Sequence, residues 1–270
     1  MSDGTELYGE SHLGEQAKAW VVVVHGYAEH SGRYQHVAKK LTDWGFNAFL
    51  YDHRGHGQSP GLLGYVPSMD QLCLDLCEIV MHVKSLAGSL PVYIVAHSMG
   101  TAVTIKAALE NELPVAGYAF SGCLVKIPDD LSPILQKLAP VLAALVPKLP
   151  VGDAGGSKFL STDPAVGEAF DADPLCYNGK VRARTGNEML RTSRWIESRL
   201  EQWVHPVLLM HGKEDKLGEF AGSEMFFARA QSSDKTFVPF PDMEHEIFNE
   251  VEKAKVFDVL QAWLHDRAPA

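Results

Sequence analysis

Serine, aspartate and histidine occur along this sequence in an order that suits nucleophilic catalysis. Ser98 lies in the segment AHSMG, Asp215 ends the segment GKED, and His245 ends the segment PDMEH. A serine hydroxyl is a poor nucleophile on its own, so it needs a base, and the base needs a carboxylate to orient it. We therefore predict that Ser98 is a nucleophile, that His245 is its base, and that Asp215 is the orienting acid.

The AHSMG segment matches the nucleophile elbow G-x-S-x-G, with alanine in the first small position. In this motif the serine occupies a strained turn between a strand and a helix. The residues two before and two after the serine must be small, because two backbones crowd there. The apolar run Pro91–Ala96 precedes Ser98, and the helical pattern Met99–Glu110 follows it. This context favours a nucleophile elbow over a chance turn, and it predicts an α/β-hydrolase fold.

The acid and the base both have competitors in the sequence. Glu214 and Asp242 are rival acids, and His245 is one of 12 histidines. Asp215 and His245 are favoured because each lies in a loop directly after a predicted strand. Catalytic groups assemble at the carboxyl ends of parallel strands, and the chain order Ser, Asp, His is that of the α/β-hydrolases.

An acyl-transfer site also needs two backbone N–H groups that face the developing oxyanion. The residue after the nucleophile, Met99, is expected to supply one of them. The loop after the strand WVVVV is expected to supply the other, and we assign it to the N–H of Tyr27. The side chain of Tyr27 is expected to line the pocket instead.

Apolar runs alternate with helical patterns along most of the chain. A strand buried on both faces is predicted at Trp20–Val24, and further strands are predicted at Phe46–Tyr51, Pro91–Ala96, Val115–Ser121, Pro206–His211 and Lys235–Phe240. Helices are predicted at His36–Trp44, Met69–Leu86, Met99–Glu110 and Val251–Leu264. Such alternation predicts an α/β protein with a mostly parallel central sheet and helices on both faces.

This alternation breaks between Leu124 and Arg194, where prolines separate helical pieces and no clear strand appears. We predict a helical cap over residues 124–194, inserted between two parts of the core, residues 1–123 and 195–270. The stretch Leu131–Leu149 has only two charged residues. It is either a buried packing helix or a cap helix whose apolar face touches membrane and lines an acyl tunnel. The second reading places Leu142 and Leu145 in that tunnel. This stretch is long enough to lie in a membrane interface but not to span a bilayer.

Composition narrows the classes of partner. The chain has 24 Lys and Arg against 34 Asp and Glu, a net charge of −10, which opposes nucleic-acid binding and electrostatic attachment to anionic lipid. Its 4 cysteines suggest no disulfide framework, and Cys73 and Cys77 are expected in the core. The first 16 residues lack the apolar run of a signal peptide. We expect a cytoplasmic protein, peripheral on membranes, with no metal and no cofactor.

Four segments carry a family resemblance: His25–Tyr34 (HGYAEHSGRY), Asp52–Ser59 (DHRGHGQS), His97–Gly100 (HSMG) and Asp173–Gly179 (DPLCYNG). From Trp20 to its end the chain resembles monoacylglycerol lipases and the related lysophospholipases. The resemblance implies the same triad, the same oxyanion positions, and hydrolysis of a small lipid ester to a fatty acid and an alcohol.

The resemblance also places Glu29, His30 and Arg33 in the loop beside the site. These residues either contact substrate or form a polar network that braces the loop. Ala96 and Thr101 stand where many relatives have glycine, and Tyr27 stands where many have a smaller residue. Substrate identity therefore stays open among monoacylglycerols, lysophospholipids and general carboxylic esters. A ligand binder without catalysis is the further alternative, which an intact Ser–Asp–His set disfavours.

Overall fold

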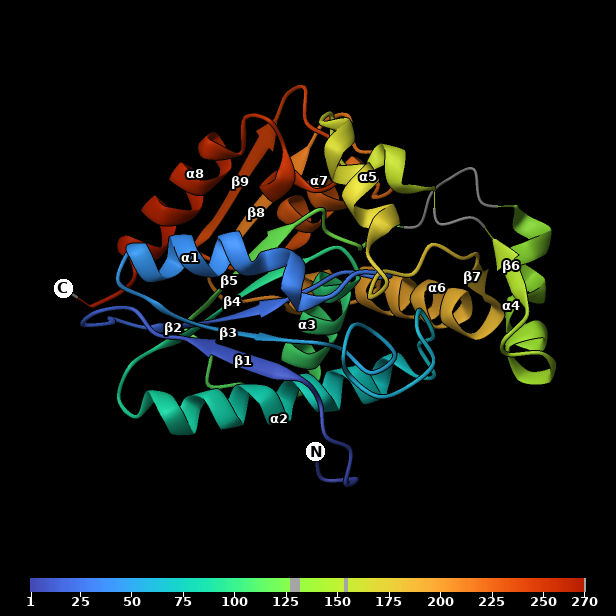
Figure 1. Ribbon diagram of the computed structural model, residues 1–270, viewed down its shortest axis with the longest axis horizontal. Helices are drawn as coiled ribbons and strands as arrows, with labels where there is room; N and C mark the ends of the chain where they lie inside the picture. The colour runs from blue at the N-terminus through green and yellow to red at the C-terminus, as the bar shows by residue number, and fades with distance from the viewer. Residues whose placement is uncertain (127–131, 153–154, 270) are drawn as a thin grey trace.

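The structure is a computed structural model that describes residues 1–126, 132–152 and 155–269 (Figure 1). Its centre is a seven-stranded sheet of order β1-β3-β2-β4-β5-β8-β9. The strands are β1 (Gly9–His12), β2 (Trp20–Val24), β3 (Asn47–Tyr51), β4 (Val92–His97), β5 (Gly117–Ser121), β8 (Val207–Gly212) and β9 (Lys235–Phe240). All neighbours pair in parallel except β1, which runs antiparallel to β3. The predicted strands form, with ends that shift by one or two residues.

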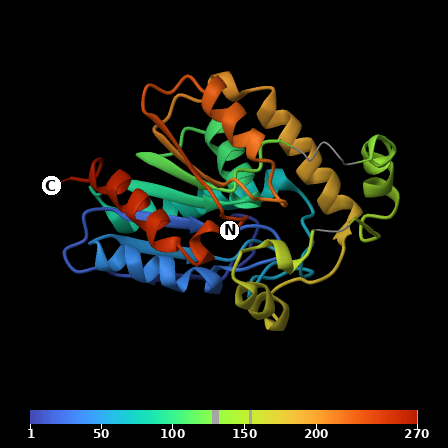
Figure 2. The same ribbon diagram turned by 90° about the horizontal axis from the view of Figure 1, so that it is seen from above.

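Helices cover both faces of this sheet (Figures 1 and 2). The core helices are α1 (Gln35–Asp43), α2 (Met69–Ala87), α3 (Met99–Glu110), α7 (Phe220–Arg229) and α8 (Lys253–His265). Short 3₁₀ turns lie at η1 (Ser31–Tyr34), η2 (Ser157–Phe159), η3 (Leu200–Gln202) and η4 (Ile247–Asn249). Successive side chains of a strand point to opposite faces, so the residues of β2 contribute in turn to two hydrophobic cores, one on each side of the sheet. Val22 packs on the side of α2 and α3, whereas Val21 packs on the side of α1 and α8.

The segment between β5 and β8, which contains the predicted cap, lies at the end of the molecule far from the C-terminus (Figure 1). Its elements are α4 (Pro133–Leu145), β6 (Pro150–Gly152), α5 (Pro164–Ala172), β7 (Val181–Arg182) and α6 (Ala183–Glu197). Leu131, the first residue of the predicted apolar stretch, lies outside the described residues.

Two expectations about the cap need correction. No strand was expected there, but β6 and β7 pair as a short antiparallel ladder. Each has only two or three residues, too few to give an alternating pattern. The boundary at Arg194 falls inside α6, which continues to Glu197 and packs on α3 of the core as well as on α4 of the cap. The single helix α6 therefore packs on both the cap and the core.

None of the helices that the structure describes is both long and apolar enough to cross a bilayer.

Candidate active site

Ser98 lies at the junction of β4 and α3, in a backbone conformation that few L-residues adopt. Its φ is +49° and its ψ is −120°. Two residues on, Gly100 packs so tightly that a Cβ there would come 2.5 Å from the carbonyl oxygens of Val24 and His25. Ala96, two residues before, is 1% exposed. The small residues of AHSMG therefore lie where strand and helix backbones crowd, and the turn lifts the serine hydroxyl above the sheet.

The structure brings the three predicted side chains together from three strand ends. Ser98 Oγ lies 2.9 Å from His245 Nε2, and His245 Nδ1 lies 2.7 Å from Asp215 Oδ2. With Asp215 ionised, Nδ1 carries the proton and donates it to the carboxylate, so Nε2 is left free to accept from Ser98 Oγ–H. The His245 ring is thus in the tautomer that a general base for Ser98 requires.

Asp215 is held by four donors. Its Oδ1 accepts the backbone N–H groups of Leu217 and Gly218, both at 2.8 Å. Its Oδ2 accepts a second histidine, His211 Nε2, at 2.9 Å. His211 is fully buried, and its Nδ1 accepts from Ser223 Oγ at 2.7 Å, which leaves the proton on Nε2. Sequence reasoning missed His211, although its place at the end of β8 was a usable signal.

These contacts shift the two ionisations in opposite directions. Burial by itself would raise the pKa of Asp215, but the charges and hydrogen bonds of His245 and His211 hold that pKa well below its usual range. Burial by itself would lower the pKa of His245, but the Asp215 carboxylate outweighs it and raises the pKa. Asp215 therefore stays ionised, and its charge would stabilise an imidazolium at His245.

The rival acids lie apart from this arrangement. Glu214 and Asp242 are both exposed, whereas the Asp215 side chain is fully buried against His245. Asp242 occupies a tight turn with a φ of +58° after β9. That turn directs the following residues back toward Asp215, so Asp242 shapes the loop of His245 without contacting its ring.

The loop after β2 is clamped from within the core. Glu29 Oε1 accepts the N–H of Gly26 at 2.6 Å, and His25 Nδ1–H donates to the carbonyl of Gly26 at 2.7 Å. The N–H of His53 donates to His25 Nε2 at 2.9 Å, which fixes the tautomer of His25. Because a peptide unit is planar, holding the oxygen of Gly26 also fixes the direction of the Tyr27 N–H. Burial lowers the pKa of His25 well below its usual value, so the His25 ring stays neutral.

Glu29 and Arg33 belong to a buried polar network. Arg33 Nη1 donates to Glu29 Oε2 at 2.9 Å, and its two terminal nitrogens also bind the carboxylate of Glu246, at 2.5 and 2.7 Å. Tyr34 Oη donates to Glu29 Oε1 at 2.7 Å. Glu29 borders the cavity above Ser98, but Arg33 does not. Of the two readings of these residues, the geometry favours bracing of the loop over substrate contact, because every charged end already has a partner.

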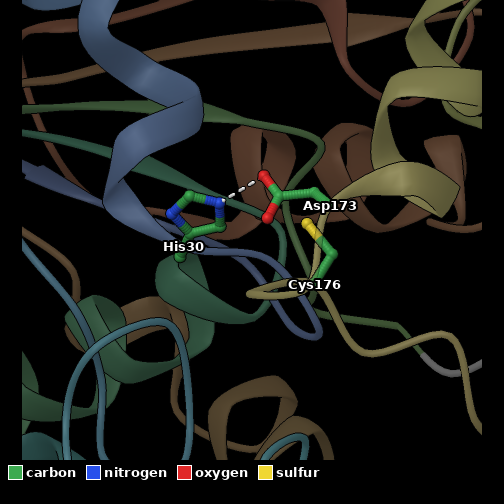
Figure 3. A group of neighbouring side chains, drawn as sticks. All are labelled: His30, Asp173 and Cys176. Atoms are coloured by element: carbon green, nitrogen blue, oxygen red, sulfur yellow. Dashed lines mark hydrogen bonds and ion pairs between the residues drawn. The ribbon is translucent and has the colours of Figure 1, made fainter.

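The same loop is tied to the cap from the other side. The N–H of Tyr177 donates to the carbonyl of Ala28 at 2.8 Å. His30 Nε2 lies 2.9 Å from Asp173 Oδ2, with the thiol of Cys176 beside this pair (Figure 3). The three ligand atoms of His30, Asp173 and Cys176 lie within 4.8 Å of one another, a set that could hold a metal ion.

The protonation of His30 decides against such a metal. The N–H of Gly32 donates to His30 Nδ1 at 3.2 Å, so the ring proton is on Nε2 and points at Asp173. A metal bound at Nε2 would need that nitrogen bare and the proton on Nδ1, which the contact with Gly32 opposes. His30 and Asp173 therefore form a hydrogen bond between core and cap, and Cys176 packs under Ala28 in a small apolar cluster.

A cavity of about 550 Å³ lies above Ser98, between the core and the cap. Tyr27, Met99 and His245 border it near Ser98, and Leu142 of α4 borders it in the cap. Tyr27 Oη donates to the carbonyl of Gly64 at 3.0 Å, which holds the ring against the wall. This volume falls within the range of small-molecule sites, roughly 300–1,000 Å³.

Leu145 departs from the expectation that it lines this cavity. It is 77% exposed and lies on the outer face of α4, whereas Leu142 lies on the inner face. At about 100° per residue, positions three apart differ by roughly 60° after a full turn. That rotation is enough to carry Leu145 from the cavity to the surface.

Three comparisons with known proteins agree with this geometry. Residues 15–252 match the family model described as serine aminopeptidase, S33. A monoacylglycerol lipase of Mycolicibacterium smegmatis is 32% identical over 90% of this chain and 87% of that protein. The human monoglyceride lipase is 30% identical over 93% and 83%. The crystal structure of Paleococcus ferrophilus monoacylglycerol lipase superposes with a TM-score of 0.88 at 27% identity, covering 97% of this chain and all of that one. The chain belongs to this family of α/β-hydrolases, with the monoacylglycerol lipases among its members.

Proposed function

We propose that this protein hydrolyses carboxylic esters of single fatty acyl chains, and monoacylglycerols above all, through an acyl-enzyme on Ser98. The observation that carries the proposal is the 2.9 Å contact between Ser98 Oγ and His245 Nε2 at the wall of the cavity between core and cap. The names of the relatives point to the same ester: a monoacylglycerol lipase and a monoglyceride lipase.

In the proposed mechanism, His245 Nε2 takes the proton of Ser98 as its oxygen attacks the ester carbonyl. The imidazolium is stabilised by Asp215, and it then gives the same proton to the departing glycerol oxygen. Water enters, loses a proton to His245, and attacks the acyl carbon. Collapse of this second tetrahedral intermediate returns the proton to Ser98 and releases the fatty acid. No metal or cofactor takes part in these steps.

The backbone N–H groups of Tyr27 and Met99 are proposed to bind the oxyanion. Met99 is the first residue of α3, so its N–H has no intrahelical partner, and the positive end of the helix dipole lies there. Tyr27 follows the clamped Gly26 carbonyl, which fixes its N–H direction before substrate arrives. Donors held in advance need no reorganisation during the reaction.

The cap is proposed to receive the acyl chain and to bring the enzyme to lipid. We take it as residues 124–194, with α6 continuing into the core. Leu142 faces the cavity, where apolar surface suits an acyl chain. The outer face of α4 exposes Ile134, Leu138, Val141 and Leu145, each between 48% and 77%. An amphipathic helix of this kind lies in the interface of a bilayer, so docking there is peripheral.

A panel of monoacylglycerols, triacylglycerols, lysophospholipids and nitrophenyl esters tests the proposal. We expect monoacylglycerols to have the highest kcat/KM, because one acyl chain fits under the cap and two further chains do not. Preference for the choline headgroup would establish a lysophospholipase instead. Best activity on the shortest esters would establish a general carboxylesterase. No hydrolysis, together with no labelling of Ser98 by a fluorophosphonate, would establish a ligand binder.

A further inference from the structure

A second cavity, of about 220 Å³, lies between α4 and α6, and Ser98 does not border it. Three arginines of α6 line one side of it: Arg184, Arg191 and Arg194. Pro140 and Ala143 of α4 lie across from them. We call the space bounded by these five residues the arginine groove. The proposed mechanism uses none of its residues.

The three arginines share one face of α6. Arg191 follows Arg184 by seven positions, about two turns, and Arg194 lies three positions further on. Three like charges on one face repel one another unless something of opposite charge lies against them. A guanidinium presents paired N–H donors that match the oxygens of a phosphate group.

The nearby carboxylates balance this charge only in part. Arg191 lies 3.3 Å from Asp70, which also lies 3.3 Å from Lys106, although Lys106 has Glu110 as a nearer partner. Glu188 stands 4.0 Å from Arg184 and 3.9 Å from Arg191, at the limit of an ion pair, and it also accepts the backbone N–H of Met69.

Arg194 has a neutral partner. Its Nη2 donates to the amide oxygen of Gln136 at 2.6 Å, and no carboxylate of the described residues lies within 4.0 Å of it. The arginine groove therefore keeps net positive charge on a chain whose total charge is −10. Its Arg191 side chain is 61% exposed, so a ligand could reach it.

The arginine groove also borders the apolar outer face of α4. At about 100° per residue, Ile134, Leu138, Val141 and Leu145 fall within one narrow face of this helix. The exposed Lys137 comes next around the helix, and Pro140 of the groove follows it. A bilayer that receives the apolar face thus brings its headgroups to the level of the arginines. α4 lies beside the start of α6 in both views (Figures 1 and 2).

We infer that the arginine groove binds the phosphate of an anionic phospholipid headgroup, and that its net positive charge makes the cap dock preferentially on anionic bilayers. The net charge of the sequence argues against such an attachment, but net charge sums the whole surface, whereas docking depends on the face that meets the membrane. The inference rests on the proposed docking through α4 and adds the lipid class that this docking selects.

Flotation of the full chain with vesicles tests it. One set of vesicles is phosphatidylcholine alone, and the other contains about 30% phosphatidylglycerol. We expect partitioning onto the anionic vesicles to be stronger by about tenfold, and to weaken when salt is raised to about 0.5 M. The double variant Arg191→Gln/Arg194→Gln should lose this gain. The matched control Lys39→Gln/Lys255→Gln removes two exposed charges from the core and should keep it.

Hydrolysis of a short nitrophenyl ester without vesicles is measured on every variant. It should be nearly unchanged, because none of the three arginines borders the cavity of Ser98. Equal partitioning of the unaltered protein onto both vesicles would overturn the inference. An equal loss in the lysine control would overturn it as well. Absence of ester hydrolysis would overturn the proposed function instead, and would leave the vesicle result standing.

Discussion

His211 Nε2 lies 2.9 Å from Asp215 Oδ2, the same oxygen that accepts His245 Nδ1 at 2.7 Å. One carboxylate oxygen thus receives two imidazole donors, while its partner oxygen receives two backbone N–H groups. A carboxylate with all four donors in place has one orientation. The direction in which Asp215 meets the base is therefore set by β8, which carries His211, and by the turn that follows it.

Loss of the His211 donor should reduce turnover without abolishing it. A hydrogen bond to a charged group contributes about 1.5–3 kcal/mol, and part of that holds Asp215 in place for His245. We expect His211→Leu to lower kcat by roughly tenfold on a short ester, with KM little changed. His211→Gln keeps a donor and should recover part of the loss. Ser223→Ala, which removes only the partner of Nδ1, should have the smaller effect. Unchanged kcat in a folded His211→Leu protein would show that the contact has no role in catalysis.

Removal of the nucleophile should leave binding and remove turnover. Ser98→Ala is expected to lower kcat by about 10⁴- to 10⁶-fold, because only binding and oxyanion stabilisation remain. The fold should be retained, since alanine is smaller and Ser98 Oγ has its contact with His245 alone among the described residues. Thermal unfolding and single-turnover assays measure both. A folded variant with near-normal turnover would rule out Ser98 as the nucleophile.

Replacement of the acid distinguishes Asp215 from its rivals. Asp215→Asn should lower kcat by roughly 10⁴-fold, because an amide no longer selects the tautomer of His245 that serves as base. Glu214→Gln and Asp242→Asn are matched changes at exposed neighbours and should have far smaller effects. If Asp242→Asn were the damaging substitution, the acid would have been assigned to the wrong loop.

Much of the fold could be predicted because most strands of the central sheet are buried on both faces. WVVVV has no polar alternation to obscure it, and β2 lies at that position. The edge strand β1 escaped prediction because GESH is polar and gains its conformation from pairing with β3. The helix α7 was missed as well, since its mixed sequence follows a loop without a clear start signal. Such elements depend on tertiary partners that a local pattern does not contain.

The site, like the fold, was predicted from the sequence only in part. Chain order and strand ends predicted which three side chains would meet, because parallel strands end at one edge. The contact between His211 and Asp215 was not predicted, because it depends on the turn after β8, which brings the two side chains together. The difference between Leu142 and Leu145 was also beyond the sequence. Both are apolar residues on one helix, and only the packing of α4 decides which one faces the cavity.

The acid limb of the pH profile should report His245. This residue must be neutral to accept a proton, so kcat/KM should rise with pH through its pKa and fall as pH drops below it. Because Asp215 raises that pKa, the limb should lie above the ordinary histidine value of about 6.5. In Asp215→Asn the residual activity should show the limb at lower pH. An enzyme fully active at pH 4, or a limb that Asp215→Asn does not move, would contradict this coupling.

Two leucines of α4 provide a matched pair that separates acyl binding from membrane contact. Leu142 borders the cavity of Ser98, whereas Leu145 is 77% exposed on the outer face of the helix. Each methylene buried in an apolar site contributes about 0.8 kcal/mol, so kcat/KM should rise with acyl length until the cavity is full. Leu142→Asp should flatten this rise while leaving nitrophenyl acetate turnover nearly intact. Leu145→Asp should keep the rise for monoacylglycerols dissolved below their aggregation limit, and should weaken adsorption to phosphatidylcholine vesicles. Kinetics over a chain-length series and vesicle flotation measure the two effects independently. The same loss of chain-length dependence in both variants would mean that α4 acts only as a unit, and that Leu142 has no separate contact with the acyl chain.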